Sequence, residues 1–512
     1  MVTWGGDINR QSKLVKGLQS SACYPHKVDY IEVIETHISW VLLTGDYAYK
    51  IKKNVNFGFV DFSSIEKRKY FCEEELRLNK RFSNSIYLDV VPITDESGSL
   101  VVNGRGKAVE YAVFMRQFEK GQLLSELAVR DALEDHVFFD IARLLADFHR
   151  VWPKSKLSLE KCMRAVSGFT VNNFVTIREN KIDSDMEDRC LANVEHWTTA
   201  SINTVVDLFR HRYANGMIKE CHGDLHLGNI TLIHGEPVFF DCIEFNPELA
   251  NIDTMSELAF LLMDLDWLGR KADSIELLNH YLVESGDYVG LTVLNFYKTY
   301  RAMVRAKVLK LRIAQNGMPK NERNDLYEDY MQYLYLADSY TAPKENTLII
   351  TYGLSGSGKT TRSRVISRDI QAVHIRSDVE RKRLFGMRPE EKSGSSIAAG
   401  IYSESVNEQT YCKLYSLADM SLQGGFNTIV DATFLNRTYR ERFRKLAEKH
   451  AAKFNILQCQ ASSTELNDRL ERRSAKKQTI SEAGIEVLTR QKENMDLLTQ
   501  SEKKCLMGSY EI

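Results

Sequence analysis

The sequence has little of what marks a secreted or membrane protein. Its nine cysteines among 512 residues form no C-x-x-C pair and show no metal-ligand spacing with histidine. The start, MVTWGGDINRQSKLVKG, lacks the apolar core of a signal peptide. The most apolar run, LAFLLMDLDWL, is interrupted by Asp264 and Asp266 and is too short to span a bilayer. We therefore expect a soluble cytoplasmic protein with reduced thiols and no membrane partner.

The sequence also lacks internal repeats and low-complexity tracts, and its 43% hydrophobic and 27% charged residues are ordinary for a globular protein. Its length allows two to four domains with full cores. The net charge of −1 is unevenly spread, since residues from 348 onward carry +7 and the residues before them −8. Arginines around a polyphosphate or nucleic-acid binding would each explain the basic part, and the charge alone does not choose.

The stretch GLSGSGKTT, residues 353–361, fills the G-x-x-x-x-G-K-[ST] pattern of a Walker A phosphate loop. A buried strand, NTLIITYG, precedes it and a helix follows it. Backbone N–H groups, the helix N-terminus and the lysine would hold the phosphates of ATP, and Thr360 would ligate Mg²⁺. The residues expected to bind the nucleotide here are Gly353, Ser355, Gly356, Ser357, Gly358, Lys359, Thr360 and Thr361.

A polar segment with a proline, ADSYTAPKENT, precedes this strand. The residues before it have the apolar spacing of a helix. We therefore place a domain boundary near residue 342, with a front domain over 1–342 and a P-loop domain over 343–512.

A second phosphotransfer pattern lies in CHGDLHLGNITLIHGEPVFFDCIEFN, residues 221–246. Asp224 and Asn229 have the D-x-x-x-x-N spacing of a kinase catalytic loop. A hairpin then brings Asp241 to the end of a strand. Asp224 would accept the proton of a substrate hydroxyl, and Asn229 and Asp241 would hold the metal. The alternative is a loop in which these side chains satisfy turn backbone.

This stretch resembles the aminoglycoside phosphotransferase family, whose catalytic loop reads H-G-D-x-H-x-x-N. The matching residues are His222, Gly223, Asp224, His226 and Asn229, with Asp241 as the metal-binding aspartate. The resemblance implies a two-lobed, protein-kinase-like fold, with an N-lobe over about 20–117 and a C-lobe over about 118–340. We expect His226 to shape the loop rather than take part in the chemistry.

The N-lobe of such a fold supplies a lysine from a strand and a glutamate from a helix. ISWVLLTGDYAYKIKK indicates two strands, the second with Lys50 and Lys52 on one face. As the lysine that faces the nucleotide we choose Lys50, with Lys52 as the alternative. Among Glu73, Glu74 and Glu75 we choose Glu75, which shares a helical face with apolar residues. For the lysine and for the glutamate, the alternative is a charged side chain on a solvated face.

Two further features of the front domain bear on its activity. The N-lobe has no G-x-G-x-x-G loop, which weakens the case for protein-kinase activity more than for phosphotransfer. After Asp241, both Asp253 and Glu257 could be acids on the substrate side, but structural capping is the interpretation that we favour.

In the rear domain, acids follow two further strands. AVHI leads to Asp378, which could accept a hydroxyl proton, and Arg381, one helical turn later, could orient the acceptor. A helix N-cap is the alternative for Asp378. FNTIV leads to Asp431, placed to organise Mg²⁺ through water. Arg437 and Arg440 follow, either facing substrate or solvated.

Near the end, Arg469, Arg472 and Arg473 precede a polar loop, and Ser481 caps the next helix. This pattern resembles the arginine-bearing lid of nucleoside-monophosphate-kinase-like enzymes. The resemblance implies catalytic roles for Arg469 and Arg473. An ordinary salt-bridged helix is the alternative.

The rear domain resembles the P-loop kinases grouped with polynucleotide 5′-kinase, chloramphenicol phosphotransferase and zeta-toxin sugar kinases. Such domains can carry an AAA label, but no arginine finger for a hexameric ring is present. The whole chain resembles bacterial bifunctional fusions of an aminoglycoside phosphotransferase with an ATP-binding protein, through YKIKK, FMRQF, HGDLHLGNI, FDCIEFN and GLSGSGKTT. The resemblance adds the domain pairing but no substrate.

We therefore expect α/β and α+β domains in one chain, the rear one with a parallel sheet between helices. The predicted activity is ATP- and Mg²⁺-dependent phosphorylation of hydroxyl groups on small molecules. The alternatives are a polynucleotide 5′-hydroxyl kinase in the rear domain, which makes nucleic acid a less favoured partner, and a domain that binds ATP only to regulate the other.

Overall fold

The computed structural model describes most of the chain in two compact units. Unit 1 comprises Met1–Val137, Trp152–Phe169 and Phe209–Leu261, and unit 2 comprises Phe138–Val151, Thr170–Leu208 and Leu262–Ile512. The predicted boundary near residue 342 falls inside unit 2, and it stays a prediction. The described residues are 7–58, 60–180, 184–315, 317–343, 345–392, 403–474 and 484–507, without the side chains of 7–9, 473 and 474.

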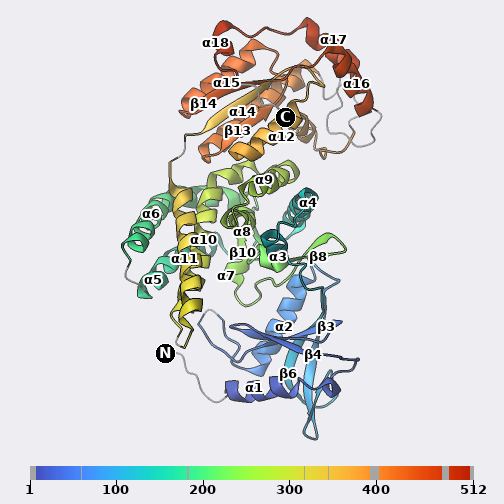
Figure 1. Cartoon of the computed structure of the whole chain (residues 1–512), viewed down its shortest axis with the longest axis vertical. Coiled ribbons are helices and arrows are strands. Elements are labelled where there is room, and N and C mark those ends of the chain that lie inside the picture. The colour runs from blue at the N-terminus through green and yellow to red at the C-terminus, as the bar shows by residue number, and fades with distance from the viewer. Residues whose placement is uncertain are drawn as a thin grey trace. The chain divides into compact units, whose positions relative to one another are not determined.

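Unit 1 begins with a six-stranded antiparallel sheet in the order β1-β2-β3-β6-β4-β5 (Figure 1). The two strands predicted over ISWVLLTGDYAYKIKK are β2 and β3, and TGD lies between them. The strands are β1 (Glu32–Glu35), β2 (Ser39–Leu43), β3 (Tyr47–Lys52), β4 (Tyr87–Glu96), β5 (Ser99–Val102) and β6 (Ala108–Arg116).

The two faces of this sheet have different coverings. Helix α1 (Asp7–Gly17) packs on one face, in an apolar core that includes Tyr49. Helix α2 (Ile65–Asn79) packs on the other face, and both Lys50 and Lys52 of β3 point toward it. Side chains alternate along a strand, so the face opposite α1 is where β3 can present two lysines to α2.

The rest of unit 1 carries the predicted catalytic loop. Strands β7 (Ile218–Glu220) and β10 (Asn251–Asp253) pair antiparallel. Strands β8 (Ile230–Ile233) and β9 (Glu236–Phe239) form the predicted hairpin. Its two turn residues have φ values of 53° and 83°, both in the left-handed region that a type I′ turn requires.

Most of the chain from β6 to the catalytic loop is helical, and so is most of the chain from the β8–β9 hairpin to the phosphate loop. Among the described residues no helix is long and apolar enough to cross a membrane. These helices are α3 (Leu124–Val129), α4 (Asp135–Val151), α5 (Leu159–Glu179), α6 (Asp185–Ala214), α7 (Pro247–Ala250), α8 (Thr254–Trp267), α9 (Lys271–Ser285), α10 (Leu291–Ile313) and α11 (Lys320–Thr341).

Unit 2 ends in a four-stranded, all-parallel sheet in the order β12-β13-β11-β14, with helices around it (Figure 1). Its central strands are apolar and buried, as a sheet covered on both faces requires. The strands are β11 (Thr347–Tyr352), β12 (Ala372–Arg376), β13 (Asn427–Asp431) and β14 (Lys453–Gln458). The helices are α12 (Lys359–Ile370), α13 (Ser377–Arg383), α14 (Glu404–Gln423), α15 (Arg437–Lys449), α16 (Ser463–Ser474), α17 (Ile485–Glu493) and α18 (Gln500–Lys503). The predicted fold class is confirmed: the chain combines α+β and α/β parts, and its rear part has a parallel sheet flanked by helices.

Candidate active sites

The front site is built around two lysines that share one glutamate. Lys50 Nζ lies 2.8 Å from Glu75 Oε1, and Lys52 Nζ lies 2.7 Å from Glu75 Oε2. Lys50 also donates to Asp241 Oδ1 at 2.5 Å, whereas Lys52 pairs with Glu244. The predicted trio of Lys50, Glu75 and Asp241 is therefore brought together, and Lys52 belongs to a neighbouring, deeper pair.

Lys50 and Asp241 hold each other in their charged forms. Burial alone lowers the pKa of Lys50, but the negative charges of Asp241 and Glu75 outweigh burial and hold that pKa well above its usual value. Burial alone raises the pKa of Asp241, and the charge and hydrogen bond of Lys50 reverse this and lower it. Each ion thus depends on its partners to stay ionised in a desolvated place.

The backbone at Asp241 is held by side chains of the sheet and of α2. Asp241 has a φ of 66°, in the left-handed region that a non-glycine residue adopts at a cost. Its N–H donates to the Tyr87 hydroxyl at 3.1 Å, and the N–H of Cys242 donates to Asn79 Oδ1 at 3.0 Å. The Asn79 amide also donates to the carbonyl of Glu75. Asn79 therefore ties the aspartate segment to the helix that carries the glutamate.

Glu257 holds the start of the catalytic loop through hydrogen bonds to its backbone. Its Oε1 accepts the N–H groups of His222 at 2.6 Å and Gly223 at 3.0 Å. The His222 ring donates from Nε2 to the carbonyl of Phe240 at 2.8 Å and accepts the N–H of Asp224 at Nδ1. Burial lowers the pKa of His222, which favours this neutral tautomer. Glu257 thus has the structural role that we favoured over a substrate-side acid.

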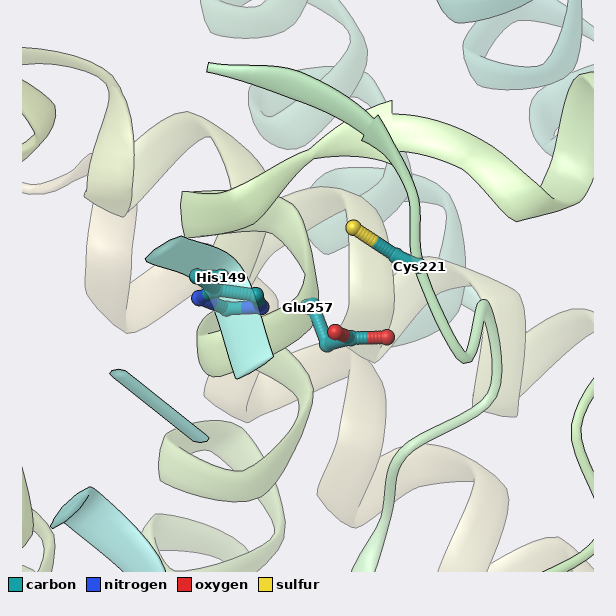
Figure 2. A group of neighbouring side chains, drawn as sticks. All are labelled: His149, Cys221 and Glu257. Atoms are coloured by element: carbon teal, nitrogen blue, oxygen red, sulfur yellow. The ribbon is translucent and has the colours of Figure 1, made fainter. Parts of the chain in front are cut away.

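Figure 2 shows the Glu257 carboxylate close to Cys221, the residue before the loop. Burial raises the pKa of the Cys221 thiol well above its usual value, and the charge of Glu257 adds to the shift. A protonated thiol in a desolvated place is an inert packing group rather than a nucleophile.

Asp253, the other acid considered for the substrate side, is also structural. It is buried and accepts two hydrogen bonds of 2.7 Å from the guanidinium of Arg212, which is itself buried. A bidentate pair of this kind fixes the start of α8 rather than facing an acceptor.

The loop itself orients Asp224 and Asn229. The Asn229 amide donates to the Asp224 carbonyl at 2.9 Å and lies 3.4 Å from its Oδ2. His226 accepts the N–H of Gly228 at Nδ1 and so shapes the turn, as we expected. The side chain of Asp224 is 40% exposed, so an acceptor can reach it. In the part of the chain that the structure describes, no protein group binds Asn229 Oδ1 or Asp241 Oδ2.

The rear site is built on the phosphate loop. Lys359 Nζ lies across the loop and donates to the carbonyls of Gly353 at 3.1 Å and Leu354 at 2.8 Å. A Cβ at Gly353 would lie 2.3 Å from the carbonyl oxygen of Cys459, so only glycine fits there. Ser357 Oγ is buried and has no hydrogen-bond partner among the described residues, as expected of a group that awaits a phosphate oxygen.

The two helices after β14 hold this loop. Arg469 Nη1 donates to the carbonyl of Gly356 at 3.3 Å. Gln491 of α17 binds Ser355 twice, accepting its N–H at 2.9 Å and donating to its hydroxyl at 3.0 Å. The predicted lid arginine Arg469 therefore reaches the loop. The side chain of Arg473 and the residue Ser481 lie outside the described part.

The candidate metal group lies at the start of α12. Thr360 Oγ1 donates to Asp431 Oδ2 at 2.6 Å, and His374 Nε2 lies 3.4 Å from the same oxygen. Burial alone raises the pKa of Asp431, but the neighbouring His374 ring and the charge of Lys359 outweigh burial and lower the pKa to about 2. Asp431 is thus an anion beside the loop. Thr361 is exposed on the first turn of α12.

The predicted acceptor residues lie on α13. Asp378 is half-buried near the start of this helix, and Arg381 is buried one turn later, where it donates to Asn407 of α14 at 3.0 Å. Beside them Tyr411 stacks on Tyr439, with ring centroids 3.9 Å apart. Asp378 is not the N-cap of α13, because Arg376 holds that position.

Arg440 does not face a substrate. It is buried, donates to the carbonyls of Phe434 and Leu435, and pairs with Glu502 at 2.6 Å. Sequence spacing allowed either a substrate contact or a solvated position, and the structure gives a third role, that of an internal brace. Arg437 is exposed.

Known proteins resemble this chain over part or most of its length. Residues 348–498 match a family model described as AAA domain. Over 452 residues the chain is 30% identical to Uncharacterized protein Rv2004c of Mycobacterium tuberculosis, and the match covers 88% of each chain. The chain belongs to the family of this mycobacterial protein. Because the match covers so much of both chains, the family pairs the front and the rear parts in one polypeptide.

Two solved structures each resemble part of the chain. The complex of amicoumacin kinase hAmiN with AMP-PNP, Ca²⁺ and Ami is 14% identical and covers 64% of this chain and 93% of its own, with a TM-score of 0.38. An unliganded sugar kinase from Janibacter sp. is 19% identical and covers 31% of this chain and 82% of its own, with a TM-score of 0.24.

Several residues of both sites escaped sequence reasoning. Asn79 lies one helical turn after Glu75 and could have been found by that spacing. Glu244 lies three residues after Asp241 in the quoted FDCIEFN stretch, but nothing marked it as the partner of a buried lysine. Gln491 contacts a loop more than 130 residues earlier, and no local pattern reveals such a pair.

Proposed function

We propose that this chain is an ATP- and Mg²⁺-dependent phosphotransferase with two kinase-type sites, which phosphorylate hydroxyl groups of small molecules. The observation that carries the proposal is the convergence of Lys50, Glu75 and Asp241 beside a loop that presents Asp224. A lysine–glutamate ion pair and a metal-binding aspartate must both be in place for phosphoryl transfer in a kinase. Three segments far apart in sequence supply these groups.

The donor sets suit a nucleotide and Mg²⁺. Mg²⁺ prefers oxygen ligands, and Asn229 Oδ1 with Asp241 Oδ2 offers them in the front site. Thr360 and Asp431 offer a hydroxyl and a carboxylate in the rear site. Mg²⁺, when bound, neutralises charge on the phosphate oxygens. The orphaned hydroxyl of Ser357 supports phosphate binding by the loop.

In the front site, Lys50 holds the phosphates while Glu75 fixes its ammonium in place. The Asn229 amide orients the Asp224 carboxylate, which accepts the proton of the acceptor hydroxyl as the new P–O bond forms. Most of the rate acceleration then comes from positioning and charge, since the protein forms no covalent bond.

In the rear site, backbone N–H groups, the N-terminus of α12 and Lys359 hold the phosphates. Asp378 acts as the base, and Arg381, fixed by Asn407, orients the acceptor. Arg469, which reaches the loop, supplies positive charge near the transferred group, and the resemblance to lid enzymes implies a catalytic role for Arg473 as well. The front domain over 1–342, the rear domain over 343–512 and a cytoplasmic location are parts of the same proposal.

The test is transfer of a radiolabelled γ-phosphate to pooled metabolites, aminoglycosides and 5′-hydroxyl oligonucleotides. We expect labelled small molecules, lost from the front site in Asp224→Asn and from the rear site in Asp378→Asn. Label on oligonucleotides alone would favour a polynucleotide kinase. Nucleotide binding without any transfer would favour a regulatory role.

A further inference from the structure

Helix α9, which precedes the predicted boundary near residue 342, contacts the edge of the rear sheet through one side chain. Asn279 Oδ1 accepts the backbone N–H of His374 at 2.8 Å, and the Asn279 side-chain amide donates to the backbone carbonyl of Ala372 at 3.1 Å. The amide also lies 2.9 Å from Ser367 Oγ. Strand β12 is at the edge of the sheet, so this carboxamide pairs with its backbone as a neighbouring strand would.

Helix α9 also forms ion pairs with α12, the helix that follows the phosphate loop. Glu276 forms ion pairs with Arg364 and Arg368 of α12, and Asp273 lies 3.3 Å from Arg368. The acidic groups come from α9 and the arginines from α12. The edge strand and the phosphate-binding helix are therefore both fixed to one element.

The side chain of His374 points from β12 to the candidate metal group. His374 is buried, and its Nε2 has no regular hydrogen bond among the described residues, with Asp431 Oδ2 at 3.4 Å as its polar neighbour. Asp431 Oδ2 is also the oxygen that accepts from Thr360. Both protein donors thus lie on one oxygen, and within the described ranges no residue binds Oδ1. The carboxylate is oriented with one oxygen held and one free.

We propose that His374 is a positioning residue for Asp431 and that Asn279 of α9 keeps His374 in register. The inference rests on the proposed nucleotide·Mg²⁺ site of the rear domain. Groups that hold a metal-ordering carboxylate set its orientation, and removing them weakens metal binding 10–100-fold in known sites. The rear site then includes a residue from the front part of the chain, and its metal affinity depends on α9.

The chain offers a matched control. Asn295 of α10 also donates to the rear domain, to the carbonyl of Gly424 at 3.0 Å. That contact is at the end of α14 and has no link to His374 or Asp431. Asn295→Ala therefore removes a comparable hydrogen bond without touching the site.

The experiment uses the full chain with Asp241→Ala to silence the front site, and measures binding of a non-hydrolysable ATP analogue by calorimetry over a range of Mg²⁺ concentrations. In His374→Phe and Asn279→Ala, we expect the Mg²⁺ needed for half-maximal binding to rise roughly 10-fold or more. His374→Gln restores an N–H donor and should stay within about threefold of the parent. Asn295→Ala should not change it.

Binding by His374→Phe at the parent's Mg²⁺ concentration would overturn the role of His374. An Asn279→Ala variant that behaves like Asn295→Ala would overturn the role of α9. If the parent binds no nucleotide through Lys359, the proposed function fails, and this inference fails with it. Normal Mg²⁺-dependent binding in every variant would contradict this inference and leave the proposed function intact.

A second measurement is made on the protein with His374 in place, and a variant serves only to assign its signals. Mn²⁺ in place of Mg²⁺ broadens NMR signals of nearby protons, and His374→Gln identifies the His374 ring signals. We expect Mn²⁺ with the nucleotide to broaden them beyond detection. Unchanged His374 signals in a nucleotide-saturated protein would contradict the proposal.

Discussion

The two lysines that would hold phosphates are fixed in opposite ways. Lys50 pairs with carboxylates that lie 25 and 191 residues away in sequence. Lys359 donates to carbonyls only five and six residues away, within its own loop. The rear lysine is therefore positioned by a local backbone shape, and the front lysine only by the folded arrangement of several elements. The position of the rear lysine should therefore tolerate changes elsewhere in the chain, whereas the position of the front lysine depends on them.

The largest expected effect separates the bases of the two sites. Asp224→Asn should lower front-site turnover by roughly 10²–10⁴, because the carboxylate acts in the transition state. Asp378→Asn should do the same to the rear site. In both, nucleotide affinity should stay within a few-fold, measured by calorimetry beside steady-state rates. Unchanged turnover in either variant would place the chemistry elsewhere.

The second prediction concerns the non-local network of the front site. Lys52→Met leaves Glu244 buried without its partner, so the free energy of unfolding should fall by about 3–5 kcal/mol. Lys67→Met, which removes an exposed pair with Asp61, should change it by less than about 1 kcal/mol.

Denaturant unfolding of both variants is the measurement. Adding Glu244→Gln to Lys52→Met should recover part of the loss, because a neutral amide costs less to bury than a charge. Equal stabilities for Lys52→Met and Lys67→Met would show that the buried network does not hold the front site together.

The third prediction concerns Arg440, a buried residue of the rear domain whose partner Glu502 lies 62 residues later in the sequence. Arg440→Met removes hydrogen bonds to buried carbonyls and the pair with Glu502, so unfolding free energy should fall by about 2–3 kcal/mol. Arg437→Met, on the exposed side of the same helix, should leave stability unchanged. A higher KM without lower stability in Arg440→Met would return Arg440 to a substrate role.

The smallest effect is a pH dependence at α9. Burial alone raises the pKa of Glu276, but hydrogen bonds from His280 and Arg364 and the charges of Arg364 and Arg368 outweigh it and lower the pKa to about 2. Because the folded-state pKa is depressed, this stabilisation is complete above about pH 4.5 and is lost as pH falls toward 2.

Glu276→Gln should therefore lower unfolding free energy at pH 7 by about 1 kcal/mol, a value reduced by the exposure of Arg364. Between pH 4.5 and 2 the difference from the parent chain should shrink toward zero. Denaturant titrations at several pH values measure it. A difference that stays constant down to pH 2 would mean that the ion pairs do not stabilise the contact.

Sequence reasoning reached the parts of both sites that short patterns encode. The phosphate loop, the Asp224–Asn229 spacing and the alternation that puts Lys50 and Lys52 on one face all depend on neighbours in the chain. Arg440 could not be assigned, because its burial depends on elements packed from elsewhere. Asn279 lies on a helix with no motif, and its contact with β12 exists only in three dimensions.

The most direct test of two separate nucleotide sites counts them by calorimetry with Mg²⁺ and a non-hydrolysable ATP analogue. The parent chain should bind two nucleotides. Lys359→Ala and Asp241→Ala should each bind one, and the double variant none. If Lys359→Ala alone abolished all binding, or if the double variant still bound nucleotide, the account of two independent sites would be contradicted.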